Sequence, residues 1–286
     1  DNATLDITRS LNAWLDNSDN RWIAAGTYRK LYIYDVNSAL FDITPTGLTA
    51  GTETSIDSTA FGGGVFGADG YGEPRLERST GNPATTWSLD TFGQNLVACS
   101  TSDGKIYEWT LSTGTIAAQV TNAPVGNTGI MVTDERFLFA LGAAGNPRKV
   151  QWCDRENNTL WTPAATNEAG SIELQTVGRI QCGVKVQNQA LILTTTDAHT
   201  ATYSGPPYVY GIERVGTSCG IVSAQGVSVV DAGAFWMGKE SFFMYSGGTV
   251  KELESDVADY VYSDINVSQM AKVVAVSNAK FSEIRW

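Results

Sequence analysis

Apolar and polar residues along the chain follow one recurring pattern. An apolar run of strand length is followed by a short polar turn and a second run with an aromatic residue near its end. The pattern occurs at residues 22–27 with 30–35, 96–101 with 104–109, 137–142 with 148–153, 191–196 with 199–204, and 234–238 with 241–246. A sixth copy begins at Phe281 and stops at Trp286. Runs rich in Val, Ile, Thr and aromatic residues, separated by Gly and Asn, predict an all-β protein.

The spacing of these copies indicates which all-β architecture to expect. With Trp22, Leu96, Phe137, Leu191, Phe235 and Phe281 as markers of the copies, the intervals are 74, 41, 54, 44 and 46 residues. A four-stranded propeller blade takes about 40 to 50 residues, which is close to four of the five intervals. We therefore predict a β-propeller of about six four-stranded blades. Five or seven blades are near alternatives because the first interval is ambiguous. A β-sandwich would explain the strands but not the period.

The long first interval contains a Gly-rich segment with few paired apolar runs. We interpret residues 50–82 as a loop inserted into a single propeller domain that spans residues 1–286. Long insertions in compact domains commonly carry function, so this loop is expected to contact a neighbouring subunit or another protein. The chain starts and stops abruptly, and we expect it to be a fragment of a longer protein. A short helix capped by Ser255 is predicted between two blades.

Two turns carry hairpin signals. Asp103-Gly104 stands between two apolar runs, and Gly247-Gly248 precedes Thr249. Both pairs tolerate the positive φ angles that a two-residue type I′ turn requires. We expect a tight hairpin at each position.

Several motifs resemble catalytic or ligand sites, and each fails a structural requirement. Gly62-x-Gly64-x-x-Gly67 matches a dinucleotide fingerprint, but Gly-rich sequence follows where a helix should begin. Ser218 lies in a Gly-x-Ser-x-Gly spelling, yet a strand-like run follows it and the histidine precedes it. We interpret the first motif as a flexible loop and the second as a polar turn.

The remaining candidates also favour structural roles. His199 is the only histidine, and we expect it to flank a turn and to be partly exposed. Residues 16–20 alternate oxygen ligands as calcium loops do, but Arg21 replaces the required Gly and no Glu follows, so a turn is favoured. With 30 acidic residues, no carboxylate pair can be chosen for glycoside hydrolysis. We expect no catalytic, cofactor-binding or metal-binding residues, and therefore no enzymatic activity.

Charge, apolar runs and cysteine content exclude some classes of function and indicate a cellular compartment. Nineteen Lys and Arg against 30 Asp and Glu give a net charge of −11, and no dense basic block occurs. Proteins that bind nucleic acid tightly neutralise phosphates with clustered cations, so tight DNA binding is not expected.

No apolar stretch approaches the roughly 18 residues that span a bilayer, so we predict no membrane insertion. The four cysteines form no C-x-x-C motif, and Cys99 lies in an apolar run as a buried free thiol would; this favours a reducing cytoplasm.

Several longer stretches resemble virion proteins of tailed bacteriophages. They are residues 26–32, 40–47, 135–148, 152–163, 213–220 and 235–238. The nearest class is the tail nozzle, or packaged-DNA stabilisation protein, of short-tailed phages. The resemblance implies a propeller in a homo-oligomeric ring, with sixfold order expected, below the portal and adaptor of the virion tail, assembled in the host cytoplasm. It transfers no functional residue.

The function expected from the resemblance is a structural ring that conducts and retains double-stranded DNA without binding it tightly. An acidic wall repels the duplex over about a Debye length, and a few cations such as Arg148 or Arg155 would touch it weakly. The alternative is a carbohydrate-binding or glycan-cleaving propeller that acts as a receptor-binding tail protein.

Overall fold

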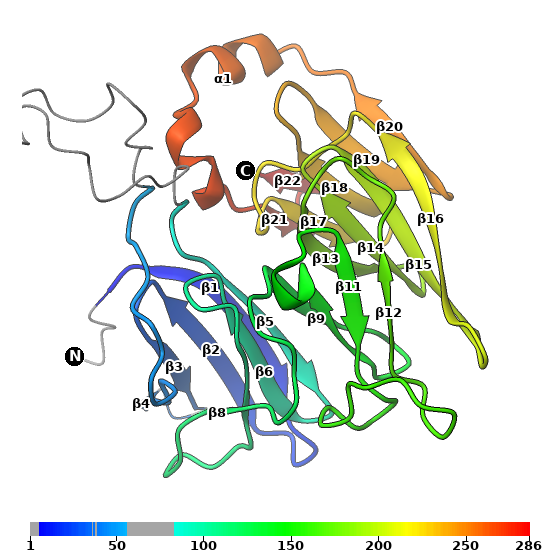
Figure 1. Ribbon diagram of the computed structural model, residues 1–286. Helices are drawn as coiled ribbons and strands as arrows, with labels where there is room; N and C mark the ends of the chain where they lie inside the picture. Colours follow the sequence, from blue (N-terminus) through cyan, green and yellow to red (C-terminus); the bar gives the residue numbers. More distant parts are fainter. Residues whose placement is uncertain (1–5, 36, 38, 56–82) are drawn as a thin grey trace, which may run out of the picture.

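The structure is a computed structural model that describes residues 6–35, 37, 39–55 and 83–286. Over these ranges the chain forms five four-stranded antiparallel sheets and one two-stranded sheet, and the strands of each sheet follow chain order (Figure 1). No helix in the described part is long and apolar enough to cross a membrane.

The five complete sheets are numbered as blades in chain order. Blade 1 contains β1 (Thr8–Leu15), β2 (Arg21–Thr27), β3 (Leu31–Tyr34) and β4 (Leu40–Asp42). Blade 2 contains β5 (Trp87–Phe92), β6 (Asn95–Ser100), β7 (Ile106–Trp109) and β8 (Ala118–Gln119). Blade 3 contains β9 (Gly129–Val132), β10 (Leu138–Leu141), β11 (Lys149–Trp152) and β12 (Gly170–Glu173), with a 3₁₀ turn, η1 (Ala143–Gly145), between β10 and β11.

The C-terminal half continues the same order. Blade 4 contains β13 (Ile180–Val186), β14 (Gln189–Thr194), β15 (Asp197–Gly205) and β16 (Val209–Thr217). Blade 5 contains β17 (Val227–Val230), β18 (Gly233–Met237), β19 (Phe242–Ser246) and β20 (Thr249–Leu253). The segment after blade 5 contains α1 (Ala258–Asp264), η2 (Val267–Lys272), β21 (Val276–Asn278) and β22 (Glu283–Arg285).

The neighbours of the first strands confirm the predicted propeller. β1 lies beside β5, β5 beside β9, β9 beside β13, β13 beside β17, and β17 beside β21. First strands that are adjacent in succession surround one axis, whereas a sandwich would stack two sheets face to face. The two runs of each sequence repeat are the second and third strands of a blade. Five complete blades and the two-stranded sixth sheet match the six units predicted.

The blades are held together by apolar faces that alternate along their strands. In β6, Leu96 and Ala98 pack in a cluster with blade 1, while Val97 and Cys99 pack in a second cluster with blade 3. Successive side chains of a strand point to opposite faces of the sheet. A middle blade is therefore buried on both faces, which explains why its second strand is almost continuously apolar.

The contact between blades 1 and 2 depends on a tryptophan packed against a glycine. Trp87 is 1% exposed, and its indole Nε1 donates a hydrogen bond of 2.6 Å to the carbonyl oxygen of Thr27. A Cβ atom on Gly26 would lie 2.5 Å from the indole ring. The absent side chain of Gly26 thus makes room for the ring.

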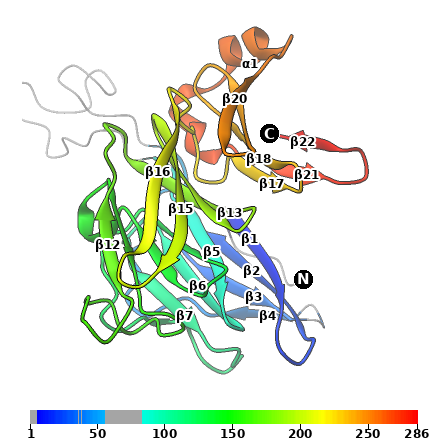
Figure 2. The ribbon, with the colours of Figure 1, turned by 90° about the vertical axis from the view of Figure 1, so that its right-hand side faces the viewer.

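Two glutamines connect parts of the chain that are far apart in sequence. Before β17, Gln225 donates hydrogen bonds from Nε2 to Ser10 Oγ at 3.2 Å and to the Trp87 carbonyl oxygen at 2.8 Å. In η2, Gln269 accepts a hydrogen bond of 3.2 Å from the Ser55 amide. Figure 2 shows α1 beside blade 5, with the short sheet β21–β22 below it. These bonds link the last blade to the first two.

The hairpin predictions gave one success and one error. Gly247 and Gly248 have φ of 58° and 85° between the paired residues Ser246 and Thr249, so the two-residue turn is confirmed. β6 ends at Ser100 and β7 starts at Ile106, so Asp103-Gly104 lies inside a longer loop and that prediction is wrong. The Asp103 carboxylate accepts hydrogen bonds from the amide of Lys105 and the hydroxyl of Tyr107, which stabilises the longer loop.

The short helix was placed nearly correctly. It runs over α1 with Val257 at its cap position, whereas Ser255 lies two residues earlier and its Oγ accepts a hydrogen bond of 3.4 Å from the Val257 amide. Of the predicted insertion, residues 56–82 lie outside the described ranges. Its proposed contact with a neighbour stays a prediction.

All four cysteines are free and buried, as predicted for Cys99. Burial raises the pKa of Cys153 and Cys182 to about 12 and that of Cys219 to about 11. The thiolate is the reactive form of cysteine, and burial disfavours it at these positions.

The packing of Trp87 on Gly26 leads to a testable expectation. The substitution Gly26→Ala should lower the free energy of unfolding by about 1–3 kcal/mol, because the added methyl group forces a buried ring to move. Gly114→Ala is the matched control, since a Cβ atom at that position would have no heavy atom within 4 Å. Urea denaturation of both variants measures the difference; equal stability of the two would contradict the packing argument.

Candidate functional site

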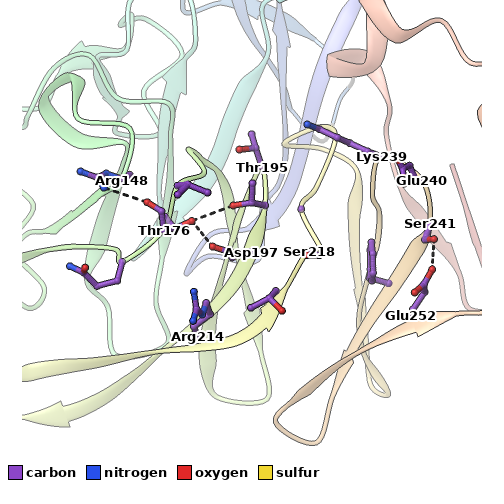
Figure 3. Close-up of a pocket in the computed structure, with 16 residues that line it drawn as sticks. Arg148, Thr176, Thr195, Asp197, Arg214, Ser218, Lys239, Glu240, Ser241 and Glu252 are labelled. Carbon is purple, nitrogen blue, oxygen red and sulfur yellow. Dashed lines mark hydrogen bonds between the residues drawn. The ribbon is translucent and has the colours of Figure 1, made fainter.

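A hollow lies where blades 3, 4 and 5 meet, and we call it the three-blade cleft (Figure 3). Its volume is about 920 Å³, within the range typical of ligand pockets. Its lining consists of Arg148, Gln175, Thr176, Val177, Thr195, Thr196, Asp197, Arg214, Thr217, Ser218, Gly220, Lys239, Glu240, Ser241, Phe243 and Glu252. Most of these residues belong to loops before a first strand, after a fourth strand, or between a second and a third strand. In antiparallel blades these loops share one end, which we call the top face.

The floor of the cleft is a turn of threonines between β14 and β15. The Thr194 hydroxyl accepts a hydrogen bond of 2.8 Å from the Asp197 amide and donates one of 3.1 Å to the Asp197 carbonyl oxygen. A Cβ atom on Gly220 would lie 2.0 Å from the carbonyl oxygen of Thr195, so the chain leaving blade 4 packs directly on this turn. The floor is fixed by backbone contacts before any ligand binds.

Carboxylates line two walls of the cleft. Asp197 is 7% exposed, and its Oδ2 accepts a hydrogen bond of 2.5 Å from the Thr176 hydroxyl. On blade 5, Glu240 is exposed, and Glu252 accepts a hydrogen bond from the Ser241 hydroxyl. Figure 3 shows Asp197 on the blade 4 side and both glutamates on the blade 5 side.

Three cations also line the cleft. Arg148 pairs with Glu173 and donates a hydrogen bond of 3.4 Å to the Thr176 carbonyl oxygen. Arg214 and Lys239 form no ion pair within the described ranges. In a chain of net charge −11, two such cations in one cleft favour binding of a polar or anionic group.

A second hollow, of about 360 Å³, follows the propeller axis between the first strands. Ser88 Oγ and Asp90 Oδ2 of β5 accept hydrogen bonds of 2.9 and 2.7 Å from the amides of Ile130 and Val132 in β9. Burial raises the pKa of Asp90, and nearby Lys185 opposes the shift. These polar groups join neighbouring blades.

The two cations expected to meet DNA lie away from this axis. Arg148 lines the three-blade cleft, and the Arg155 guanidinium carbon lies 5.9 Å from the centroid of the Tyr203 ring. Neither residue lines the axial hollow. Neither residue therefore lines the axis of the single propeller, and the weak contact of the two residues with DNA stays a prediction.

The prediction for Ser218 is confirmed, and the one for His199 is wrong. Ser218 follows β16 with φ of 54° and no helix begins after it, so its interpretation as a turn is confirmed, although the turn lines the cleft. His199 lies inside β15 and is 3% exposed, so the expected partial exposure is wrong. Blade 4 is covered on both faces, which buries polar as well as apolar residues of its third strand.

The acidic segment at residues 16–20 forms the turn that was favoured. The Asp16 carboxylate accepts hydrogen bonds from the amides of Ser18 and Asn20, the Asn20 side chain and the Trp22 indole. The side-chain bonds from Asn20 and Trp22 lower the pKa of Asp16 to about 2. Its oxygens are thus engaged by the protein.

Among residues with described positions, no three His, Cys, Asp or Glu side chains converge as metal ligands would. The Gly62-x-Gly64-x-x-Gly67 motif lies outside the described residues.

Five aromatic residues near the ends of the third strands are interpreted as packing within the blades: Tyr34, Trp109, Trp152, Tyr203 and Tyr245. Trp109, Trp152 and Tyr245 are 1%, 4% and 2% exposed, which confirms the packing of these three, whereas Tyr34 and Tyr203 are half-buried. The cleft residues themselves were not predicted, because they come from loops of three blades and share no motif. The regular recurrence of loops at one end of the blades was the available signal.

Comparisons with known proteins identify the fold and no family. No family model matches the chain, and no curated protein matches it. Virginiamycin B lyase from Staphylococcus aureus has a TM-score of 0.53 and 10% identity, over 87% of this chain and 71% of that chain. A streptogramin B lyase has a TM-score of 0.49 and 9% identity over 89% and 71% of the two chains. A gluconolactonase from Xanthomonas campestris has a TM-score of 0.46 and 9% identity, over 86% of this chain and 76% of that chain.

This likeness bears on two predictions. It agrees with a β-propeller, and at 10% identity it shows the fold alone. The prediction that the protein is not an enzyme is wrong: it rested on absent motifs, whereas virginiamycin B lyase, a protein with the same propeller fold, is named as a lyase. A propeller builds its sites from separate loops, so a missing motif does not exclude catalysis.

Proposed function

We propose that the protein is a carbohydrate-binding β-propeller that holds a glycan in the three-blade cleft. The observation that carries the proposal is the lining: threonine and serine hydroxyls, three carboxylates and the cations Arg214 and Lys239 share one cleft of about 920 Å³. Sugar hydroxyls both donate and accept hydrogen bonds, so a wall with both kinds of partner suits them. Phe243 adds an aromatic surface to the lining.

A cleft that spans three blades suits an extended ligand. Its contacts come from Arg148 on blade 3, Asp197 and Arg214 on blade 4, and Lys239 on blade 5. The loops are anchored on rigid sheets, so little ordering free energy is needed on binding. This supports a chain of sugars over a single small solute.

Cleavage of the bound glycan is a second candidate activity. The observation that favours it is the placement of carboxylates on two walls of the cleft, with buried Asp197 on the blade 4 side and two glutamates on the blade 5 side. Glycoside hydrolysis requires little more than two carboxyl groups that flank the scissile bond. We assign Asp197 and Glu240 as these two carboxyl groups. One donates a proton and the other accepts one, from opposite sides of the scissile bond.

The tail assignment remains a proposal supported by the sequence resemblance. A glycan-binding cleft suits a tail protein that contacts the host surface better than one that lines a DNA conduit, and the net charge of −11 is consistent with weak DNA binding in either role.

The binding proposal is tested with Lys239→Ala. Loss of this cation should weaken glycan binding about tenfold, equivalent to about 1.4 kcal/mol, because a charged hydrogen bond is removed. Lys251→Ala, an exposed lysine of β20 outside the cleft, is the matched control and should bind as the unmodified chain does. Calorimetric titration with glycans selected from an array measures both; no binding to any glycan, or equal loss in both variants, would overturn the proposal.

Cleavage is tested with Asp197→Asn, which keeps an oxygen that can accept the Thr176 hydrogen bond. Turnover, followed as new reducing ends, should fall at least about a hundredfold while glycan affinity changes little, as expected for loss of an acid–base group. Asp231→Asn, between β17 and β18, is the control. Turnover unaffected by Asp197→Asn would exclude this assignment.

Reconstruction of the phage particle tests the tail role. We expect density for the propeller on the exposed, distal part of the tail with the three-blade cleft open to solvent. A ring around the tail axis with the cleft buried would instead support the conduit role. Absence of the protein from the particle would refute both the receptor-binding role and the conduit role.

A further inference from the structure

His199 is a buried polar side chain without a hydrogen-bond partner. It is 3% exposed, and neither Nδ1 nor Nε2 has a partner among the described residues. Buried polar groups are nearly always paired, so an orphaned imidazole requires an explanation. Neither the fold nor the proposed cleavage uses it.

The imidazole lines a separate hollow of about 290 Å³ between β12 of blade 3 and the outer strands of blade 4. Apolar and polar groups share this lining, which consists of Ile172, Glu173, Leu174, Gln175, His199, Ile212 and Arg214. Gln175 and Arg214 also line the three-blade cleft, so the two hollows meet at these residues. We call the smaller one the His199 pocket.

Arg214 is placed to act together with His199. The two residues are directly opposed in the register of β15 and β16, so their side chains extend from the same face of the sheet. Arg214 forms no ion pair in the part of the chain that is described, whereas the nearby Glu173 carboxylate is paired with Arg148. The guanidinium is therefore available to a ligand.

The protonation state of His199 defines what it can offer. Burial lowers the pKa of His199 below its usual value, Arg214 adds to this and Asp197 opposes it. A neutral imidazole has one N–H donor and one acceptor nitrogen. The pocket thus combines the Arg214 guanidinium and a neutral imidazole donor with the Glu173 carboxylate, whose charge is compensated by Arg148.

We propose that the His199 pocket binds a carboxylate, with Arg214 and His199 donating hydrogen bonds to its two oxygens and the apolar residues contacting the attached carbon frame. A single guanidinium matches one negative charge, and guanidinium–carboxylate geometry is favourable. This inference rests on the proposed function in one respect: the ligand is then an acidic glycan whose uronate group enters the pocket from the three-blade cleft.

The chain has one histidine, so an untagged sample gives imidazole NMR signals that belong to His199 alone. Titration with glucuronate should shift these signals saturably and raise the pKa of His199, because a carboxylate stabilises the imidazolium. Glucose at the same concentrations should leave them unchanged. Arg214→Gln should weaken glucuronate binding at least tenfold, while Arg136→Gln, whose guanidinium pairs with Glu156, should not change it.

The outcomes separate this inference from the proposed function. No shift with glucuronate, or an equal shift with inorganic phosphate or glucose, would overturn the carboxylate site, whatever glycans bind to the cleft. A saturable, Arg214-dependent shift in a protein that binds no glycan would support the site and refute the glycan proposal.

Discussion

Each blade of this protein depends on its neighbour to bury one of its faces. Leu96 and Ala98 belong to one interblade cluster, and the alternate residues Val97 and Cys99 belong to the next. An isolated four-stranded sheet would leave both sets exposed. Because burial of apolar surface is the main favourable term in folding, the blades acquire stability together. Positions such as Gly26, where the ring of Trp87 packs, set how closely two blades approach.

The same constraint shows how the two ends of the series differ. The outer face of blade 5 is covered, since Phe242 packs against Tyr262 and Trp286 from the segment that follows it. The opposite face of blade 1 carries Leu11 and Leu15, which are 66% and 58% exposed. The hydrogen bonds of Gln225 and Gln269 tie these ends across the top face without supplying a blade-sized apolar surface. Hydrogen bonds therefore connect the two ends of the series of blades, where the apolar packing between blades stops.

The sequence predicted what repeats and missed what does not. The paired runs gave the second and third strands of every blade, because buried strands leave a strong apolar signal. The signal says nothing of which polar residue is buried: His199 resembled a turn-flanking residue, although sheets on both sides cover it. The cleft escaped detection because Arg148, Arg214 and Lys239 lie on three different blades. Their proximity results from the circular arrangement, which no local pattern encodes.

Charge shows why a global property cannot define a local site. A net charge of −11 determines the field at long range, where it disfavours polyanions such as duplex DNA. At physiological ionic strength that field decays over about 8 Å, so a ligand inside the three-blade cleft responds to the groups that line it. There Arg148 is balanced by Glu173, while Arg214 and Lys239 have no such partner among the residues described. An acidic protein can therefore repel one polyanion from its surface and hold a single carboxylate in a pocket that positions its cations.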